Sequence, residues 1–278
     1  MTVAARLAGF MAVLLGVFGL ATLAGGAVDP PKRGIATCQL EPRMDAMAEP
    51  MGVASEQNGY RIVPVDTTLA AGSERILRFR IVDTNGRAVR GFCDEHGARL
   101  HLIIVSRDLS DYHHLHPRLA SDGTWSIPVR LREPGGYRAF ADFKTKRASA
   151  VLGTDIFAPG ELRPRPLPHA SRMQRVDGYT VRMDGDRARA GGTTDLHFSV
   201  WRDGREVKDL QPYLGARGHL VALREGDLAY LHVHPEPGLA DGAAKFWVAA
   251  PSTGTFRMFL DFQVDGVVHT AAFTVVVS

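Results

Sequence analysis

The chain has 278 residues, of which 45% are hydrophobic and 23% are charged, and both values are typical of globular proteins. This length leaves room for two domains of ordinary size. The net charge is only +3, and aromatic residues do not alternate with basic clusters, so the composition argues against a nucleic-acid partner.

Residues 1–28 carry a hydrophobic segment, because Leu7–Val28 holds no charged residue and is rich in Leu, Val, Ala and Gly. Such a stretch is long enough to span a bilayer as an anchor. Its apolar core followed by small residues fits a cleaved secretory signal equally well. Both interpretations place the rest of the chain outside the cytoplasm. We therefore expect an extracytoplasmic protein, held in the membrane by this segment if it is uncleaved and secreted if it is removed.

Residues 29–57 have several prolines and no strand-like alternation, which predicts a flexible linker. Met44, Met47 and Met51 stand out in it, and thioethers are soft ligands that suit Cu(I). Their spacing also fits one packed face of a short helix, which is the favoured interpretation. The chain has two cysteines, Cys38 and Cys93, in no recognisable pattern. Because Cys38 falls in this linker, we expect no disulfide.

Residues 58–159 form the first predicted domain. Short apolar runs alternate with turn signals such as Asn85-Gly86 and Asp122-Gly123, and no helical period of useful length is present. About seven short strands in about 100 residues are typical of an immunoglobulin-like sandwich. Residues 160–175 contain closely spaced prolines and predict a stiff linker.

Residues 176–278 repeat the first domain. Asp177-Gly178-Tyr179 matches Asn58-Gly59-Tyr60, and the segment 256–262 matches 137–143. An internal duplication follows from this self-similarity. The predicted fold class is therefore all-β, with two tandem immunoglobulin-like β-sandwich domains after an N-terminal hydrophobic segment.

One hairpin pattern occurs in both copies, at residues 101–117 and 219–235, with matched positions 118 apart. Each copy has a His, an apolar run, a polar break, a Tyr and a His-x-His-Pro, which predicts strand, turn and returning strand. A turn between Asp108 and Leu109 puts Ile103 opposite His114. Residues two apart on a strand share a face, so three imidazoles are expected to meet at the open end of each hairpin. The predicted metal ligands are His101, His114, His116, His219, His232 and His234.

Within each predicted site, two histidines come from one strand and one comes from across the hairpin. A chelate on one rigid strand loses little entropy on binding, so His114 and His116 are expected to contribute more affinity than His101. Other polar residues recur in both copies and are candidates to orient the ligands from behind. These are Tyr112, Tyr230, Asp142 and Asp261. The competing interpretation is that each Asp pairs with the recurring Arg138 or Arg257 at the sandwich edge.

The first hairpin, its His-Leu-His-Pro and the later Gly-Gly-Tyr-Arg-Ala-Phe-Ala-Asp-Phe resemble the YtkA-like group of extracytoplasmic domains. The resemblance is strongest to a duplicated, membrane-attached form found in actinobacteria, and it covers both domains. It implies a protein that accompanies copper and heavy-metal handling. Linkers in such proteins are often rich in His and Met, whereas residues 29–57 hold Met but no His.

Three classes of function are compatible with these patterns. The first is an extracytoplasmic metal-binding protein with one His-based site per domain, holding copper or zinc, which both suit imidazole. The alternative is a non-catalytic structural or partner-binding sandwich of the cell envelope, with structural histidines and an envelope protein as partner. A remote alternative is a zinc enzyme with three His ligands, similar to the ligand pattern of α-type carbonic anhydrases. No separate general base recurs in both copies, so we predict that the protein is not an enzyme.

Overall fold

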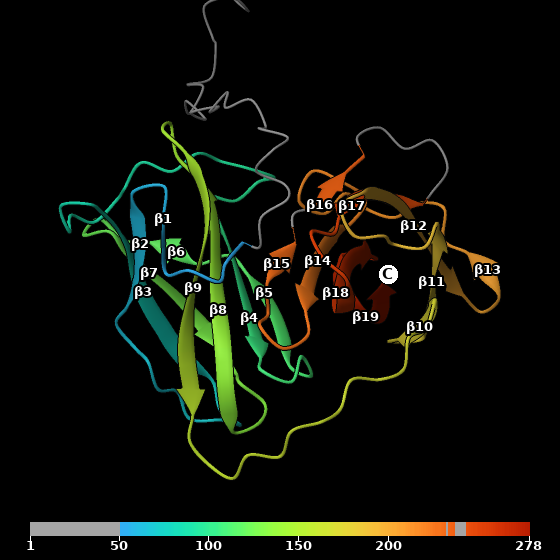
Figure 1. Ribbon diagram of the computed structural model, residues 1–278, viewed down its shortest axis with the longest axis horizontal. Coiled ribbons are helices and arrows are strands. Elements are labelled where there is room, and N and C mark those ends of the chain that lie inside the picture. Colours follow the sequence, from blue (N-terminus) through green and yellow to red (C-terminus); the bar gives the residue numbers. More distant parts are fainter. Residues whose placement is uncertain (1–50, 232, 237–242) are drawn as a thin grey trace, which may run out of the picture. The chain divides into compact units, whose positions relative to one another are not determined.

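The computed structural model describes residues 51–231, 233–236 and 243–278 (Figure 1), in which every helix or strand element is a β-strand. The predicted signal or anchor, residues 1–28, and residues 29–50 of the predicted linker lie outside the described residues. Within the described part of the chain, no helix has the length and apolar character needed to cross a bilayer.

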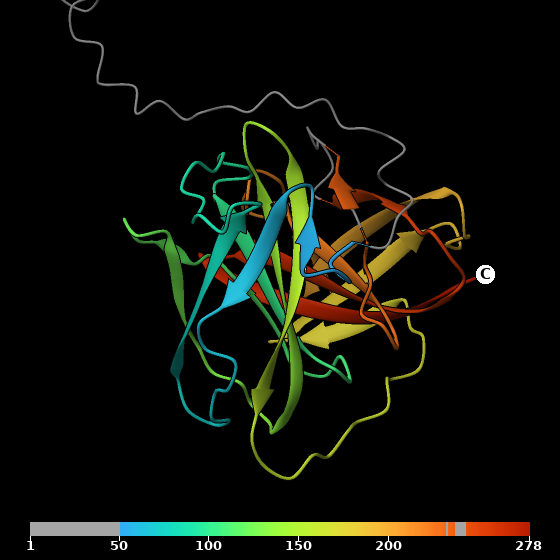
Figure 2. The same cartoon turned by 60° about the vertical axis from the view of Figure 1, so that its left-hand side comes forward.

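The first sandwich consists of two antiparallel sheets that enclose a common core. One sheet has the order β1 (Glu56–Gln57), β2 (Tyr60–Pro64), β3 (Arg75–Asp83), β7 (Thr124–Val129) and β6 (Arg118–Leu119). The other, called the β4 sheet below, has the order β5 (Tyr112–Leu115), β4 (Leu100–Ser106), β8 (Gly135–Lys144) and β9 (Ser149–Ala158). Alternate residues of facing strands, such as Phe79, Trp125 and Leu102, fill the space between them. The long β8–β9 pair can be followed in Figure 2.

The second sandwich repeats this arrangement. Its outer sheet has the order β10 (Met173–Val176), β11 (Tyr179–Gly185), β12 (Thr193–Arg202), β17 (Ala244–Ala249) and β16 (Val233–Pro235), with β13 (Arg205–Glu206) also paired to β12. Its other sheet, called the β14 sheet, has the order β15 (Tyr230–Leu231), β14 (His219–Arg224), β18 (Gly254–Val264) and β19 (Val267–Val277). Phe198, Phe246 and Phe273 fill its core. The predicted all-β tandem of immunoglobulin-like sandwiches is confirmed.

The duplication extends to the hydrogen-bond register of the two hairpins. In the first, Ile103 pairs with His114, as the position of the turn predicts, and Val105 pairs with Tyr112. In the second, Leu223 pairs with Tyr230, which is the same pairing 118 residues later. The returning strands then differ. β5 stays beside β4 as far as Leu115, whereas β15 ends at Leu231 and the chain continues as β16, paired with β17 of the outer sheet.

A third hydrophobic core lies between the β4 sheet and the β14 sheet. All seven residues of β4 are buried, because Leu102 and Ile104 face the core of their own sandwich while Ile103 and Val105 face the second sandwich. We call this cluster the inter-sandwich core. It consists of Ile103, Val105, Leu109, Tyr112, Phe140, Val151, Val221, Leu223, Leu228, Tyr230 and Phe259. Burial on both faces explains why the first strand of each hairpin is a continuous apolar run in the sequence.

The structure tests two predictions about the linker and the cysteines, at Met51 and at Cys93. Met51 pairs through its backbone with Tyr230 and packs against the inter-sandwich core, so this methionine has a packing role. Cys93 is buried and disulfide-bonded, so the expectation of no disulfide is wrong. A cysteine in a linker is free to approach a buried partner, and linker composition therefore does not argue against a bridge. Met44, Met47 and Cys38 lie outside the described residues.

Candidate metal centre

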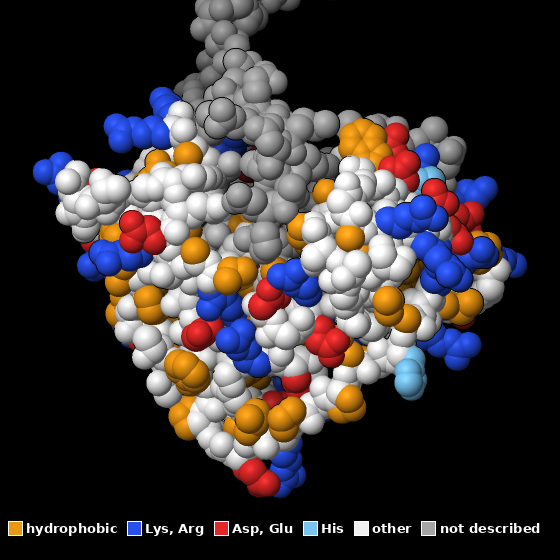
Figure 3. All heavy atoms as spheres, viewed as in Figure 1, with side chains coloured by type: hydrophobic (Ala, Val, Ile, Leu, Met, Phe, Trp, Pro, Cys, Tyr) orange, Lys and Arg blue, Asp and Glu red, His pale blue; other side chains and the backbone are white. Residues whose placement is uncertain are grey.

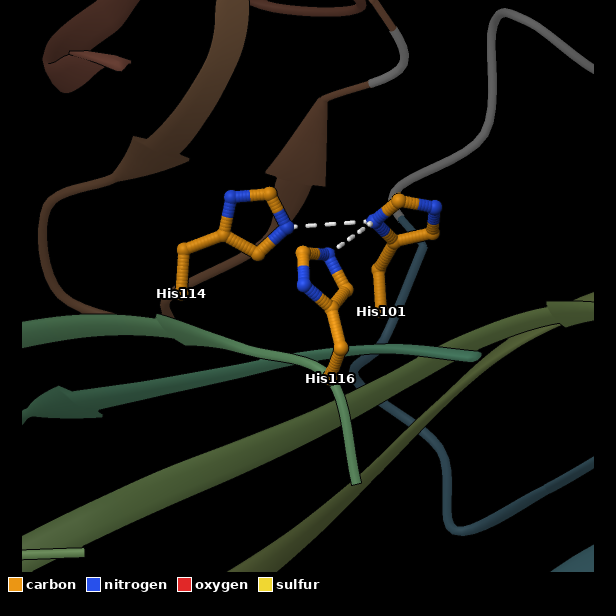
Figure 4. A group of neighbouring side chains, drawn as sticks. All are labelled: His101, His114 and His116. Carbon is orange, nitrogen blue, oxygen red and sulfur yellow. Dashed lines mark hydrogen bonds between the residues drawn. The ribbon is translucent and has the colours of Figure 1, made fainter. Parts of the chain in front are cut away.

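Three histidines of the first sandwich converge at the open end of its hairpin. His101 lies on β4, His114 on β5, and His116 just after β5. Figure 4 shows the three rings pointing toward one another, with His101 Nδ1 3.1 Å from His114 Nε2 and 3.3 Å from His116 Nε2. Nitrogens that share one zinc or copper ion at about 2.0–2.1 Å lie roughly 3–4 Å apart. The predicted convergence of this trio therefore has the spacing of a metal site.

Hydrogen bonds behind two of these rings determine which nitrogens carry protons. His101 Nε2 lies 3.1 Å from the Glu95 carbonyl, and His114 Nδ1 lies 2.8 Å from the Asp261 carboxylate. Both partners only accept, so these two nitrogens donate, and a neutral imidazole has a single N–H. His101 Nδ1 and His114 Nε2, the nitrogens on the other side of the two rings, face each other across 3.1 Å. A cation between these two nitrogens would have an imidazole ligand on each side.

Burial favours the neutral form of two of these imidazoles. The pKa of His101, which is 6% exposed, is lowered to about 3 by burial and, to a smaller extent, by neighbouring imidazoles. The pKa of His116 is lowered to about 4 by burial, with the nearby His114 adding to the effect. Metal binding needs neutral imidazole, so the lowered pKa values of His101 and His116 favour it.

The second sandwich contributes to the same centre. The Asp261 carboxylate on β18 binds His114, and it also accepts a hydrogen bond of 2.6 Å from Thr270 Oγ1. His219 at the start of β14 stacks parallel to His101, with ring centroids 5.5 Å apart, and its centroid is 4.4 Å from that of His114. His114, His219 and Asp261 form a second group of possible metal ligands, which overlaps the first at His114.

His219, which was predicted to belong to a separate site in the second sandwich, lies beside His101 and His114 of the first. The physical reason is the inter-sandwich core, which brings the starts of β4 and β14 together. The returning strand of the second hairpin also leaves the β14 sheet at Leu231, so His234 lies on β16, where its backbone pairs with Trp247. His232 lies outside the described residues. The roles of His232 and His234 stay predictions.

The predicted orienting residues divide into those that contact the centre and those beside it. Asp261 orients His114, and burial raises the pKa of the neighbouring Tyr112 well above its usual value. Asp142 pairs in register with His101, and burial raises its pKa to about 7. Tyr230 lies beside Asp142, and burial raises its pKa as well.

The competing Asp–Arg interpretation does not describe the observed contacts of the arginines. Arg138 binds Asp155 and the carbonyls of Gly52 and Val53, and Arg257 donates to Thr274. Sequence reasoning missed Glu95 and Thr270. Glu95 acts through its backbone carbonyl, which gives no sequence signal. Thr270 occupies the position of Val151 in the first sandwich, and this difference between the copies was the available signal.

A family model matches the chain twice, over residues 55–156 and 174–278. The chain belongs to the family described as "Domain of unknown function (DUF8832)". The two matches confirm that the chain carries a duplicated family domain, and the YtkA-like resemblance itself stays a prediction. A search among curated proteins found no match.

Solved structures of low similarity include bacterial adhesins. The Escherichia coli adhesin FdeC is 13% identical, with a TM-score of 0.26 and coverage of 80% of this chain and 65% of that one. The bacterial integrin-binding protein invasin is 16% identical, with a TM-score of 0.25 and coverage of 79% and 40%. InvD of Yersinia pseudotuberculosis is 11% identical, with a TM-score of 0.27 and coverage of 80% and 58%. The chain thus spans less than two thirds of each, and such low scores identify no shared partner.

Proposed function

We propose that this protein is an extracytoplasmic metal-binding protein whose centre is formed by His101, His114 and His116. The observation that carries the proposal is the convergence of three imidazole nitrogens, with His101 Nδ1 3.1 Å from His114 Nε2 and 3.3 Å from His116 Nε2. This is the spacing of nitrogens that share one zinc or copper ion. Burial also lowers the pKa of His101 and His116, which favours the neutral imidazole that metal binding needs.

Copper or zinc is the proposed ion. Three imidazole nitrogens suit Cu(II) and Zn²⁺, and hard cations such as Ca²⁺ prefer oxygen ligands. The carboxylate that holds His114 from behind is a common partner of metal-bound histidine, because it fixes the tautomer and the ring orientation. The disulfide at Cys93 and the hydrophobic segment at residues 1–28 support an extracytoplasmic location, where disulfides persist.

The alternative is a non-catalytic structural or partner-binding protein. The observation in its favour is that His101 and His114 already hydrogen-bond to Glu95 and Asp261, so they could serve only to join parts of the fold. On the face seen in Figure 3, positive and negative side chains are interspersed, and this face therefore favours no strongly charged partner. The burial of His101 also argues for a non-enzyme, because a substrate has little access to it.

The deciding experiment is titration of the metal-free, full-length chain with Zn²⁺ and with Cu²⁺. The test variant carries His101→Ala, His114→Ala and His116→Ala, and His169→Ala is the matched control because His169 is exposed in the linker. We expect the triple variant to lose the bound ion and the control to keep it. Circular dichroism reports whether each variant is folded. Unchanged binding by a folded triple variant would leave only the structural role.

A further inference from the structure

The two sandwiches meet through contacts that occur in exchanged pairs. Tyr112 stacks on Phe259 with ring centroids 4.0 Å apart, and their counterparts Tyr230 and Phe140 are in contact at 5.7 Å. Each contact is therefore the duplicate of the other, as in the self-complementary interface of a two-fold dimer. Equivalent residues can touch each other only at the axis of such an interface. His101 and His219 are equivalent, and they stack on each other.

The histidine centre thus lies on the approximate two-fold axis and has neighbours from both sandwiches. Asp261 and His114 are almost completely buried and joined at 2.8 Å across the interface. His219 Nδ1 is buried and has no hydrogen-bond partner among the described residues. An unpartnered buried nitrogen is costly in the absence of a ligand. With His114 and Asp261, His219 forms a group of possible metal ligands that shares His114 with the three converging imidazoles.

We infer that the metal centre is shared: His219 supplies a fourth imidazole, Asp261 positions His114, and the bound ion holds the two sandwiches together. This inference rests on the proposed function. A fourth protein ligand would close the coordination sphere, as in structural zinc sites, rather than leave the open position of a catalytic one. The ligand class is therefore a copper or zinc ion held for stability or storage.

Sharing the ligands couples metal binding to docking of the sandwiches. An ion that binds only the docked arrangement stabilises it by mass action. The coupling is reciprocal, so a change that weakens docking must weaken metal binding by the same factor, even when every ligand is intact. Leu223 provides this test. It is buried in the inter-sandwich core and lies four residues along β14 from His219.

The experiment measures Zn²⁺ affinity of the full-length chain by competition with a chelator. We expect His219→Ala to weaken binding about tenfold or more, and Asp261→Asn to weaken it about 10–100-fold, the usual effect of losing a carboxylate behind a ligand. Asp261→Glu, which keeps an acceptor, should recover part of the loss. Leu223→Asp should weaken binding, and the matched Leu223→Val should not. With Cu²⁺, paramagnetic resonance should report fewer coupled imidazole nitrogens in His219→Ala than in the wild type.

The outcomes separate this inference from the proposed function. Wild-type protein that binds neither ion would overturn both. Binding that depends on His101, His114 and His116 but is unchanged in folded His219→Ala and Asp261→Asn variants would overturn only the sharing. Unchanged affinity in a folded Leu223→Asp variant whose sandwiches have separated would overturn the coupling. Separation is read from an increase in the radius of gyration, measured by small-angle X-ray scattering.

Discussion

His114 of the first sandwich donates its Nδ1 proton to the Asp261 carboxylate of the second at 2.8 Å, with side chains only 3% and 2% exposed. A pair buried this completely binds the two sandwiches to each other as well as fixing the direction of one imidazole. Its loss should therefore be measurable without any metal.

Asp261→Asn should destabilise the metal-free protein. Hydrogen bonds that involve a charged group contribute about 1.5–3 kcal/mol, and the amide would replace one of two acceptor oxygens with a donor. Urea unfolding in the presence of a chelator gives the free energy. Asp184→Asn, in a surface ion pair with Arg182, is the control and should stay within about 0.5 kcal/mol of the wild type. Equal stability of the two variants would show that the buried hydrogen bond contributes nothing.

His101→Ala should weaken metal binding at least as much as His116→Ala. The sequence pattern predicted that the two histidines of one strand contribute more affinity. In the structure, however, His101 Nδ1 lies close to both His114 Nε2, at 3.1 Å, and His116 Nε2, at 3.3 Å. His101 is also held by the Glu95 carbonyl, so its ring is oriented before the ion arrives. Isothermal titration of the single variants checks this order. A clearly smaller effect of His101→Ala would restore the sequence-based expectation.

The metal-free protein should lose stability as the pH falls from about 6.5 to about 4. Burial lowers the folded-state pKa of His101 to about 3 and of His116 to about 4, so below pH 6.5 the unfolded chain takes up protons that the folded chain does not. For His101 the slope is at most about 1.4 kcal/mol per pH unit. Asp142 has the opposite effect on stability, because its raised pKa of about 7 favours the folded state as the pH falls.

The comparison that isolates the histidine contribution is between the wild type and His101→Gln. Both keep Asp142, so its effect cancels in the difference. Thermal melts at pH 7.5, 6 and 5 should show a flatter pH dependence for the variant. Parallel curves for the two proteins would mean that His101 is protonated normally in the folded state.

The stacked pair Tyr112–Phe259 should couple the two sandwiches energetically. Truncation of a buried aromatic side chain costs about 3–5 kcal/mol, and an aromatic pair adds about 0.5–1.5 kcal/mol beyond the burial of its area. A double-mutant cycle with Tyr112→Leu and Phe259→Leu measures that coupling. The duplicate pair Phe140–Tyr230, with its longer centroid distance, should give a smaller value. A coupling energy of zero at Tyr112–Phe259 would argue that the sandwiches separate in solution.

The fold and the first histidine trio could be predicted because both follow from local pattern. A turn between Asp108 and Leu109 and side chains that alternate along each strand determine that Ile103 faces His114. The same alternation places His116 on the face of His114. The duplication at a constant spacing then predicts the second sandwich from the first.

The joining of the two copies into one centre could not be predicted in the same way. It depends on which sheet faces pack together, and the only sequence sign was that Ile103 and Val105 are as apolar as Leu102 and Ile104. Nothing in the sequence indicated that the second returning strand ends its pairing with β14 at Leu231. The two hairpins carry matching motifs, and the choice of β17 as partner is made by the tertiary fold.

The most direct measurement is anomalous diffraction from crystals of the protein grown with Zn²⁺ or Cu²⁺. The account predicts an anomalous peak about 2.0–2.1 Å from His101 Nδ1, His114 Nε2 and His116 Nε2, with Asp261 still bound to His114 Nδ1. Density in which these three imidazoles keep their positions, with metal bound only elsewhere or not at all, would contradict it.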